Sequence, residues 1–193
     1  QAGVLRPDGD PKVRFGTINQ TNGHGTAVAG CAAAQTNNNR GIASTGFKCT
    51  LLPIKAASDN PQIGGILAGY PGIVYAADMG AAVINCSWGG TQNNPLGKDV
   101  INYALGKGSL VVTASGNNSL FTDKTQFYPG GYEGVLNVGA SSLSDRPSSF
   151  TNYGSDVTVY APGDDIYSTF PNNRYQTFSG TSFSAPLVAG ICG

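Results

Sequence analysis

Five short apolar runs rich in valine, isoleucine and leucine recur along the chain and limit the folds it can adopt. They cover residues 49–56, 81–88, 109–115, 134–141 and 156–162. Continuous apolar runs of this length are typical of strands buried on both faces of a parallel sheet. Between them the sequence predicts helices over residues 25–35, 63–79 and 95–107. The alternation predicts an α/β fold with a mostly parallel central β-sheet flanked by helices.

The length and charge of the chain exclude several classes of protein. At 193 residues the chain is long enough for one domain and short for two, so we expect a single domain over residues 1–193. Charged residues make up 11% of the chain and cancel to zero net charge, which disfavours nucleic acid and anionic membranes as partners. No apolar run approaches the roughly 20 residues that a membrane-spanning helix needs.

The four cysteines, Cys31, Cys49, Cys86 and Cys192, stand far apart and share no CxxC spacing. That arrangement argues against a zinc cluster. Cys31, Cys86 and Cys192 stand among small apolar residues, which favours buried free thiols. One or two disulfides are the alternative if the protein is secreted.

The segment SGTSFSAPLVAG places a serine at the start of a predicted helix. A proline is tolerated in the first turn of a helix, so Pro186 predicts that the helix begins near Ser182. The helix dipole and the free backbone N–H groups at that end suit a nucleophilic serine. An N-cap serine on an ordinary buried helix is the alternative that this segment alone leaves open.

His24 is the only histidine of the chain and stands in the segment TNGHGTAVAG. Gly23 and Gly25 would allow a tight turn there, and the small residues that follow predict a helix from Gly25. A catalytic base and a structural turn residue both fit this segment. A metal ligand is disfavoured because no second histidine exists and no cysteine lies beside it, so we expect no metal among the site residues.

Asn117 stands in the segment ASGNNS, just after the predicted strand over residues 109–115. Ligands of α/β sheets bind at the carboxyl ends of the strands. A carboxamide placed there can donate a hydrogen bond to a developing oxyanion. A turn asparagine with a left-handed backbone is the alternative.

Seven segments in succession resemble the sequence blocks of the subtilisin-like serine peptidases. They are GHGTAVAG, INCSWGG, ASGNN, YPGGYEGVLNVGA, SSFTNYG, VYAPG and SGTSFSAPLVAG. The resemblance runs from about Asn22 to the last residue, and the serine block is the most specific part of it. It implies a three-layer subtilisin-like fold and a serine endopeptidase that acts on polypeptides through an acyl-enzyme.

Carried over residue by residue, the resemblance implies that His24 is the general base, Ser182 the nucleophile and Asn117 the side-chain donor of the oxyanion hole. It also implies a peptide groove between two walls. The residues of its first wall, which pair with the substrate backbone, are Ser87, Trp88 and Gly89. The residues of its second wall are Ala114, Ser115 and Gly116. Phe127 falls at the floor of the pocket for the residue before the cut, and we expect it to make that pocket shallow.

The orienting aspartate of the resembled family lies in a strand of the form apolar-apolar-Asp-Ser/Thr-Gly, and no such strand precedes His24. Asp8 and Asp10 are the only acidic residues there, in a loop flanked by proline and glycine. We therefore expect the aspartate upstream of Gln1, in a domain truncated at both ends, with Asp8 or Asp10 as the weaker alternative. A non-catalytic peptide-binding module, or an inactive fragment, is the competing interpretation.

The resemblance carries three further expectations. Calcium is common in the family in a loop after the histidine helix, and residues 35–40 occupy that place here, although they hold no carboxylate. No cofactor is required by the expected chemistry. A secreted or cell-surface location, and a propeptide or protein inhibitor as a partner, are implied in the same way.

Overall fold

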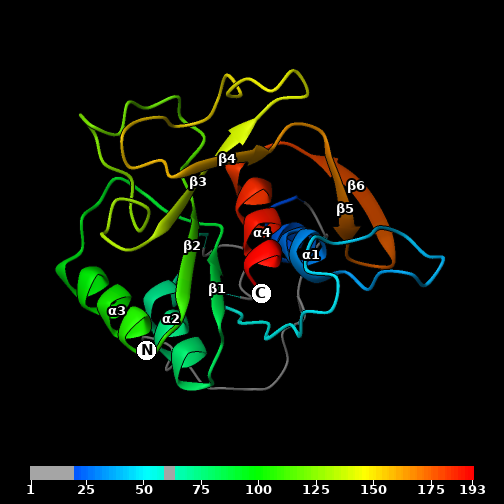
Figure 1. Cartoon of the computed structure of the whole chain (residues 1–193), viewed down its shortest axis with the longest axis horizontal. Helices are drawn as coiled ribbons and strands as arrows, with labels where there is room; N and C mark the ends of the chain where they lie inside the picture. Colours follow the sequence, from blue (N-terminus) through cyan, green and yellow to red (C-terminus); the bar gives the residue numbers. More distant parts are fainter. Residues whose placement is uncertain (1–19, 59–63) are drawn as a thin grey trace.

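The computed structural model describes residues 20–58 and 64–193 (Figure 1). Its central sheet has four parallel strands in the order β1-β2-β3-β4. They are β1 (Val83–Cys86), β2 (Leu110–Ala114), β3 (Leu136–Ser141) and β4 (Val159–Pro162). Each strand lies within one of the predicted apolar runs. Because the strands are parallel, the carboxyl ends of all four lie at one edge of the sheet.

Helices cover both faces of this sheet (Figure 1). They are α1 (Gln20–Ala33), α2 (Gly69–Asp78), α3 (Pro95–Gly106) and α4 (Thr181–Cys192). Ile84 and Val111 belong to the core under α2 and α3, whereas Val112 and Ala114 belong to the core under α4. Side chains alternate between the two faces of a strand, so β2 contributes to both cores. The predicted α/β fold class, with a parallel sheet between helices, is confirmed.

A two-stranded antiparallel hairpin lies outside the sheet and was not among the predicted elements. It consists of β5 (Ile166–Phe170) and β6 (Arg174–Phe178). Its turn contains Asn172 and Asn173, both with positive φ (65° and 55°). An Asn-Asn pair between residues of strand type is a hairpin signal, so the segment FPNNRYQTF could have revealed it.

The hairpin packs against α1 and fixes that helix in place. Ser168 donates a hydrogen bond to the carbonyl of Ala27 at 2.7 Å, and Thr169 donates to the carbonyl of Thr26 at 2.8 Å. Phe170 and Phe178 share a buried cluster with Ala27. Because His24 lies on this helix, the hairpin sets the position of the histidine.

One predicted strand is wrong. Residues 49–56 form no strand, and Ala57 makes only an isolated bridge to Ile66. Leu51 and Leu52 are 46% and 40% exposed. A strand needs a neighbour to satisfy its backbone groups, and within the described residues no strand lies beside this run.

The helix boundaries were predicted unevenly. α3 agrees with the prediction because local signals mark its start: Asn94 caps it by accepting a hydrogen bond from the N–H of Leu96 at 3.0 Å, and Pro95 is its first residue. α2 begins at Gly69, later than predicted, and the first predicted residue, Ile63, lies outside the described residues. α1 begins at Gln20, earlier than predicted, so Gly23, His24 and Gly25 are helical and form no turn.

All four cysteines are free, which agrees with the thiol interpretation. Cys31 and Cys86 are buried as expected, but Cys192 is exposed because it lies in the last turn of α4. Burial raises the pKa of Cys86 to about 12, so its thiol stays protonated. Among the described residues, no helix has both the length and the apolar character needed to cross a membrane.

Candidate active site

Ser182 lies in the first turn of α4, as Pro186 predicted. The helix is preceded by Gly180, whose φ of 149° brings the chain into the helix without a side chain at that point. The first backbone N–H groups of a helix have no partner within the helix. Within the described residues the N–H of Ser182 makes no hydrogen bond, so it is free to bind an anionic oxygen.

Pro186 has a second effect, which concerns the carbonyl of Ser182. Pro186 stands four residues after Ser182 and has no N–H, so it cannot donate the usual helical hydrogen bond. The hydroxyl of Ser87 donates to that carbonyl instead, at 2.8 Å. Asn85 in turn donates to the Ser87 hydroxyl at 3.0 Å. Residues on and just after β1 thereby hold the start of α4.

His24 occupies the side of α1 that faces α4. Its ring meets the ring of Phe183 edge-on, with centroids 5.6 Å apart and an interplanar angle of 62°. Burial lowers the pKa of His24 below its usual value, because a buried imidazolium loses the hydration that stabilises its charge. Within the described residues no carboxylate bonds to the ring. A neutral imidazole in this place can accept a proton.

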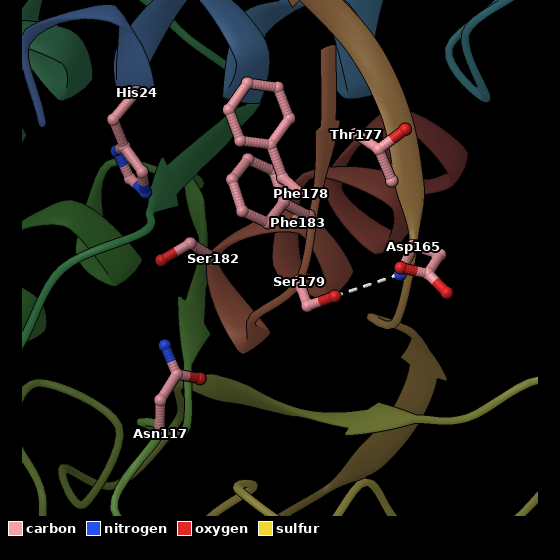
Figure 2. Close-up of a pocket in the computed structure, with 8 residues that line it drawn as sticks. All are labelled: His24, Asn117, Asp165, Thr177, Phe178, Ser179, Ser182 and Phe183. Atoms are coloured by element: carbon pink, nitrogen blue, oxygen red, sulfur yellow. Dashed lines mark hydrogen bonds between the residues drawn. The ribbon is translucent and has the colours of Figure 1, made fainter. Parts of the chain in front are cut away.

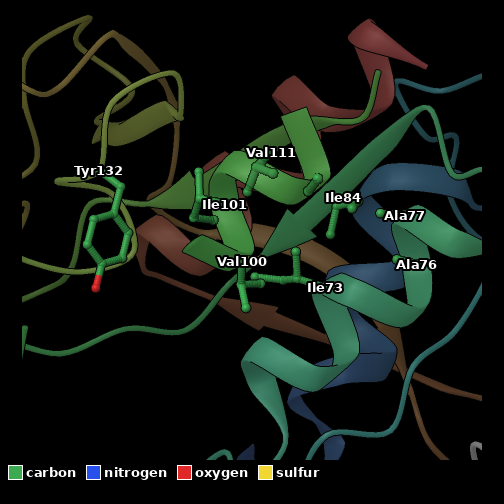
Figure 3. Packing of buried hydrophobic residues seen from close by; sticks show 10 residues of the cluster. Ile73, Ala76, Ala77, Ile84, Val100, Ile101, Val111 and Tyr132 are labelled. Atoms are coloured by element: carbon green, nitrogen blue, oxygen red, sulfur yellow. The ribbon is translucent and has the colours of Figure 1, made fainter. Parts of the chain in front are cut away.

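Asn117 follows β2, and its side chain has a fixed orientation. Its Oδ1 accepts hydrogen bonds from both the N–H and the hydroxyl of Thr181, each at 2.8 Å. The amide oxygen therefore faces the start of α4, and the amide nitrogen is left pointing into the pocket (Figure 2). That nitrogen donates to no other group among the described residues. It can donate to a ligand beside Ser182.

One pocket of about 260 Å³ brings the three predicted catalytic residues together. In Figure 2 the ring of His24 and the amide nitrogen of Asn117 both point toward Ser182, which lies between them. The remaining lining residues are Asp165, Thr177, Phe178, Ser179 and Phe183. None of these five was predicted, because they belong to the unrecognised hairpin and its flanks or to an apolar position of α4.

The first predicted wall of the peptide groove continues β1. Ser87, Trp88 and Gly89 follow the strand directly, and the ring of Trp88 meets that of Tyr70 edge-on at 5.4 Å. No hydrogen bond engages the backbone N–H or C=O of Gly89 within the described residues. Free backbone groups in extended chain can pair with an added strand.

The second predicted wall lies at the end of β2. Ala114 ends the strand, the carbonyl of Ser115 accepts from Asn152 at 2.7 Å, and Gly116 has a φ of 103°. Phe127 lies between the two walls. A Cβ added to either Gly89 or Gly116 would meet its ring. The structure thus places a large ring where the sequence predicted a shallow pocket.

Two sequence-based expectations concern groups outside this pocket. Asp8 and Asp10 lie outside the described residues. In the loop over residues 35–40, the side-chain oxygen of Asn38 accepts a hydrogen bond from the N–H of Arg40 at 3.0 Å, so this oxygen is turned into the loop. The described part of the chain brings no three His, Cys, Asp or Glu side chains together for a metal. Calcium binding at this loop stays a prediction.

Comparison with known proteins agrees with the fold and with the resemblance to the subtilisin-like serine peptidases. Residues 8–193 match the model of the subtilase family. Thermitase of Thermoactinomyces vulgaris is 46% identical over 172 residues, which cover 89% of this chain and 60% of thermitase. A thermophilic serine proteinase of Bacillus sp. (strain AK1) is 47% identical over 171 residues, which cover 88% of this chain and 41% of that protein. The chain therefore spans about half the length of these relatives.

Solved structures give the same result. A protease of Pseudoalteromonas arctica PAMC 21717 superimposes with a TM-score of 0.78 at 31% identity, over 86% of this chain and 56% of that one. A cold-adapted subtilisin-like serine proteinase superimposes with a TM-score of 0.70 at 30% identity, over 87% of this chain and 59% of that one. The family match covers nearly the whole chain and includes Ser182, His24 and Asn117. The chain belongs to the subtilase family.

Proposed function

We propose that this chain belongs to a serine endopeptidase in which Ser182 is the nucleophile, His24 the general base and Asn117 an oxyanion donor. One observation carries the proposal: the three side chains line a single pocket at the start of α4. The similarity to thermitase and to other serine proteases supports the same reaction class.

The proposed reaction is an acyl transfer. The hydroxyl oxygen of Ser182 attacks the carbonyl carbon of the scissile peptide bond while His24 takes the hydroxyl proton. The negative charge on the carbonyl oxygen is stabilised by the free N–H of Ser182 and the amide nitrogen of Asn117. His24 then protonates the leaving amine and the C–N bond breaks, which leaves the acyl group on Ser182. Water next attacks the acyl carbon while His24 takes a proton from it, and His24 returns that proton to the Ser182 oxygen as the ester C–O bond breaks.

The substrate is a polypeptide in extended conformation. Its backbone would pair with the free backbone groups of Gly89, beside β1, as an added strand. The carboxylate that would orient His24 is proposed to come from outside the described residues. A secreted or cell-surface location and a propeptide or protein inhibitor as a partner belong to this proposal.

Labelling with a fluorophosphonate tests the assignment of the nucleophile. The reagent should form one covalent adduct on the intact protein, located at Ser182 by peptide mass spectrometry, because only an activated serine reacts at a useful rate. His24→Ala should abolish the adduct, since no base then removes the proton. Ser184→Ala is a matched control: Ser184 lies in the same helix but is buried and donates to the carbonyl of Pro162, so its removal should leave the adduct unchanged.

The outcome also separates the enzyme from a binding module. An intact protein that binds peptides but shows neither an adduct at Ser182 nor cleavage would refute the endopeptidase assignment. That result would favour a subtilase-like module that holds peptides without cutting them.

A further inference from the structure

The pocket at Ser182 extends away from the predicted peptide groove. None of the seven groove residues, Ser87 to Gly89, Ala114 to Gly116 and Phe127, lines it. Beyond Ser182 its walls come from the hairpin and its flanks: Asp165, Thr177, Phe178 and Ser179 (Figure 2). If the acyl part of the substrate lies along β1, this extension receives the residues that follow the scissile bond.

Asp165 is the charged residue of this extension. The other lining side chains are hydroxyls, an amide and aromatic rings, apart from His24, whose pKa is lowered by burial, which favours its neutral form. Asp165 is exposed, and within the described residues no hydrogen bond or ion pair engages its carboxylate. The pocket therefore carries a negative charge that is free to bind a cation.

The backbone at Asp165 is fixed although its carboxylate is free. The residue has a φ of 53°, which aspartate tolerates better than most residues, and its N–H donates to the hydroxyl of Ser179 at 3.0 Å. Asp164 differs, because its carboxylate already accepts a hydrogen bond from Ser148 at 3.0 Å. The guanidinium of Arg174, in the same hairpin, is also engaged by other groups. Its central carbon lies 5.2 Å from the centre of the Phe170 ring, and its Nε–H donates to the carbonyl of Pro171.

We propose that Asp165 selects substrates with a lysine or arginine just after the scissile bond. The inference rests on the proposed endopeptidase function and names a substrate class for it. A cationic side chain leaving Ser182 along the pocket reaches the free carboxylate of Asp165, whereas an acidic side chain is repelled by it.

Internally quenched peptides test this preference. Three peptides share one sequence up to the cut, with a small residue before it, and carry Lys, Gln or Glu at the two following positions. For the intact protein we expect kcat/KM to favour Lys over Gln by about two- to fivefold, the range that an exposed ion pair supplies, with Glu cleaved most slowly. Added salt should reduce the ratio.

Asp165→Asn removes the charge and keeps a residue that accepts a positive φ. In this variant the Lys to Gln ratio should fall to about one, because the ion pair is lost. Asp99→Asn removes the same charge on α3, at the opposite end of the molecule from the hairpin (Figure 1), and should keep the wild-type ratio.

The outcomes distinguish the two proposals. Equal rates for the Lys and Gln peptides in the wild type, or an unchanged ratio in Asp165→Asn, overturn the role of Asp165 and leave the peptidase assignment intact. No cleavage of any peptide, together with no phosphonate adduct at Ser182, overturns the peptidase assignment itself.

Discussion

The hydroxyl of Ser87 donates a hydrogen bond to the carbonyl of Ser182, at 2.8 Å, in the place that the missing N–H of Pro186 leaves open. This contact joins the end of β1 to the proposed nucleophile. It gives Ser87, in the first predicted wall of the peptide groove, a structural role beside the one proposed for it in substrate binding.

Ser87→Ala should leave the Ser182 carbonyl without its donor and lower the free energy of unfolding by about 1–3 kcal/mol. Pro186→Ala restores an N–H at the right position, so it should recover part of this loss in the double variant. Urea unfolding of the four proteins in a double-mutant cycle measures the coupling. Additive losses would show that the two residues act separately.

Phe183→Leu should lower kcat by about two- to tenfold, the worth of an aromatic pair, while KM changes little. The ring of Phe183 holds the imidazole of His24 edge-on and stacks on Phe178 at 4.9 Å, so leucine removes a support of the base without emptying the site. Steady-state kinetics on one peptide measure both constants. A rise in KM at constant kcat would place Phe183 in substrate binding instead.

When the chain of residues 1–193 is folded, the pKa of His24 should lie below about 6.5, because burial lowers it. Folding then favours the neutral form of His24. The contribution of His24 to the free energy of unfolding is therefore complete above pH 6.5 and is lost as the pH falls toward the pKa of the folded state. His24 is the only histidine, so an NMR titration of its ring reports this residue alone. A midpoint above the value in urea would reveal a negative charge beside the ring.

Phe127→Ala should raise kcat/KM for peptides with Phe or Tyr before the cut, because the ring of Phe127 fills the space between Gly89 and Gly116. The wild type should prefer small residues at that position. Rates on matched Ala, Leu and Phe peptides check both statements. If the wild type already cleaves best after Phe or Tyr, the shallow-pocket hypothesis is wrong.

Gly30→Ala should destabilise the protein by about 1–3 kcal/mol, the cost of overpacking. A Cβ on Gly30 would collide with the side chains of Ser168 and Thr169, whose hydroxyls hold α1. Gly25→Ala is the matched control in the same helix: among the described residues, apart from its chain neighbours and the backbone of α1, no atom lies within 4 Å of an added Cβ, so it should stabilise by up to about 1 kcal/mol. Thermal unfolding of both variants in a Ser182→Ala background, which removes the proposed nucleophile, tests the contrast.

The sequence by itself predicted most strands of the sheet and the starts of two helices, α3 and α4. Four of the five apolar runs became strands, Asn94 and Pro95 marked the start of α3, and Pro186 placed Ser182 near a helix start. These features depend on neighbours in the sequence, through side-chain period, capping and the missing proline N–H. The run over residues 49–56 failed for the opposite reason, since an apolar run becomes a strand only where another strand accepts its hydrogen bonds.

Only the tertiary structure decided how the site is assembled. The sequence named His24, Asn117 and Ser182 one by one, but their meeting in one pocket depends on α1 being held by the hairpin and on α4 being packed against the sheet. The position of Asp165 in the lining of that pocket and the ring of Phe183 beside His24 are likewise products of packing. Contacts between distant parts of a chain follow from how its elements bury their apolar faces together, and no local pattern records that arrangement.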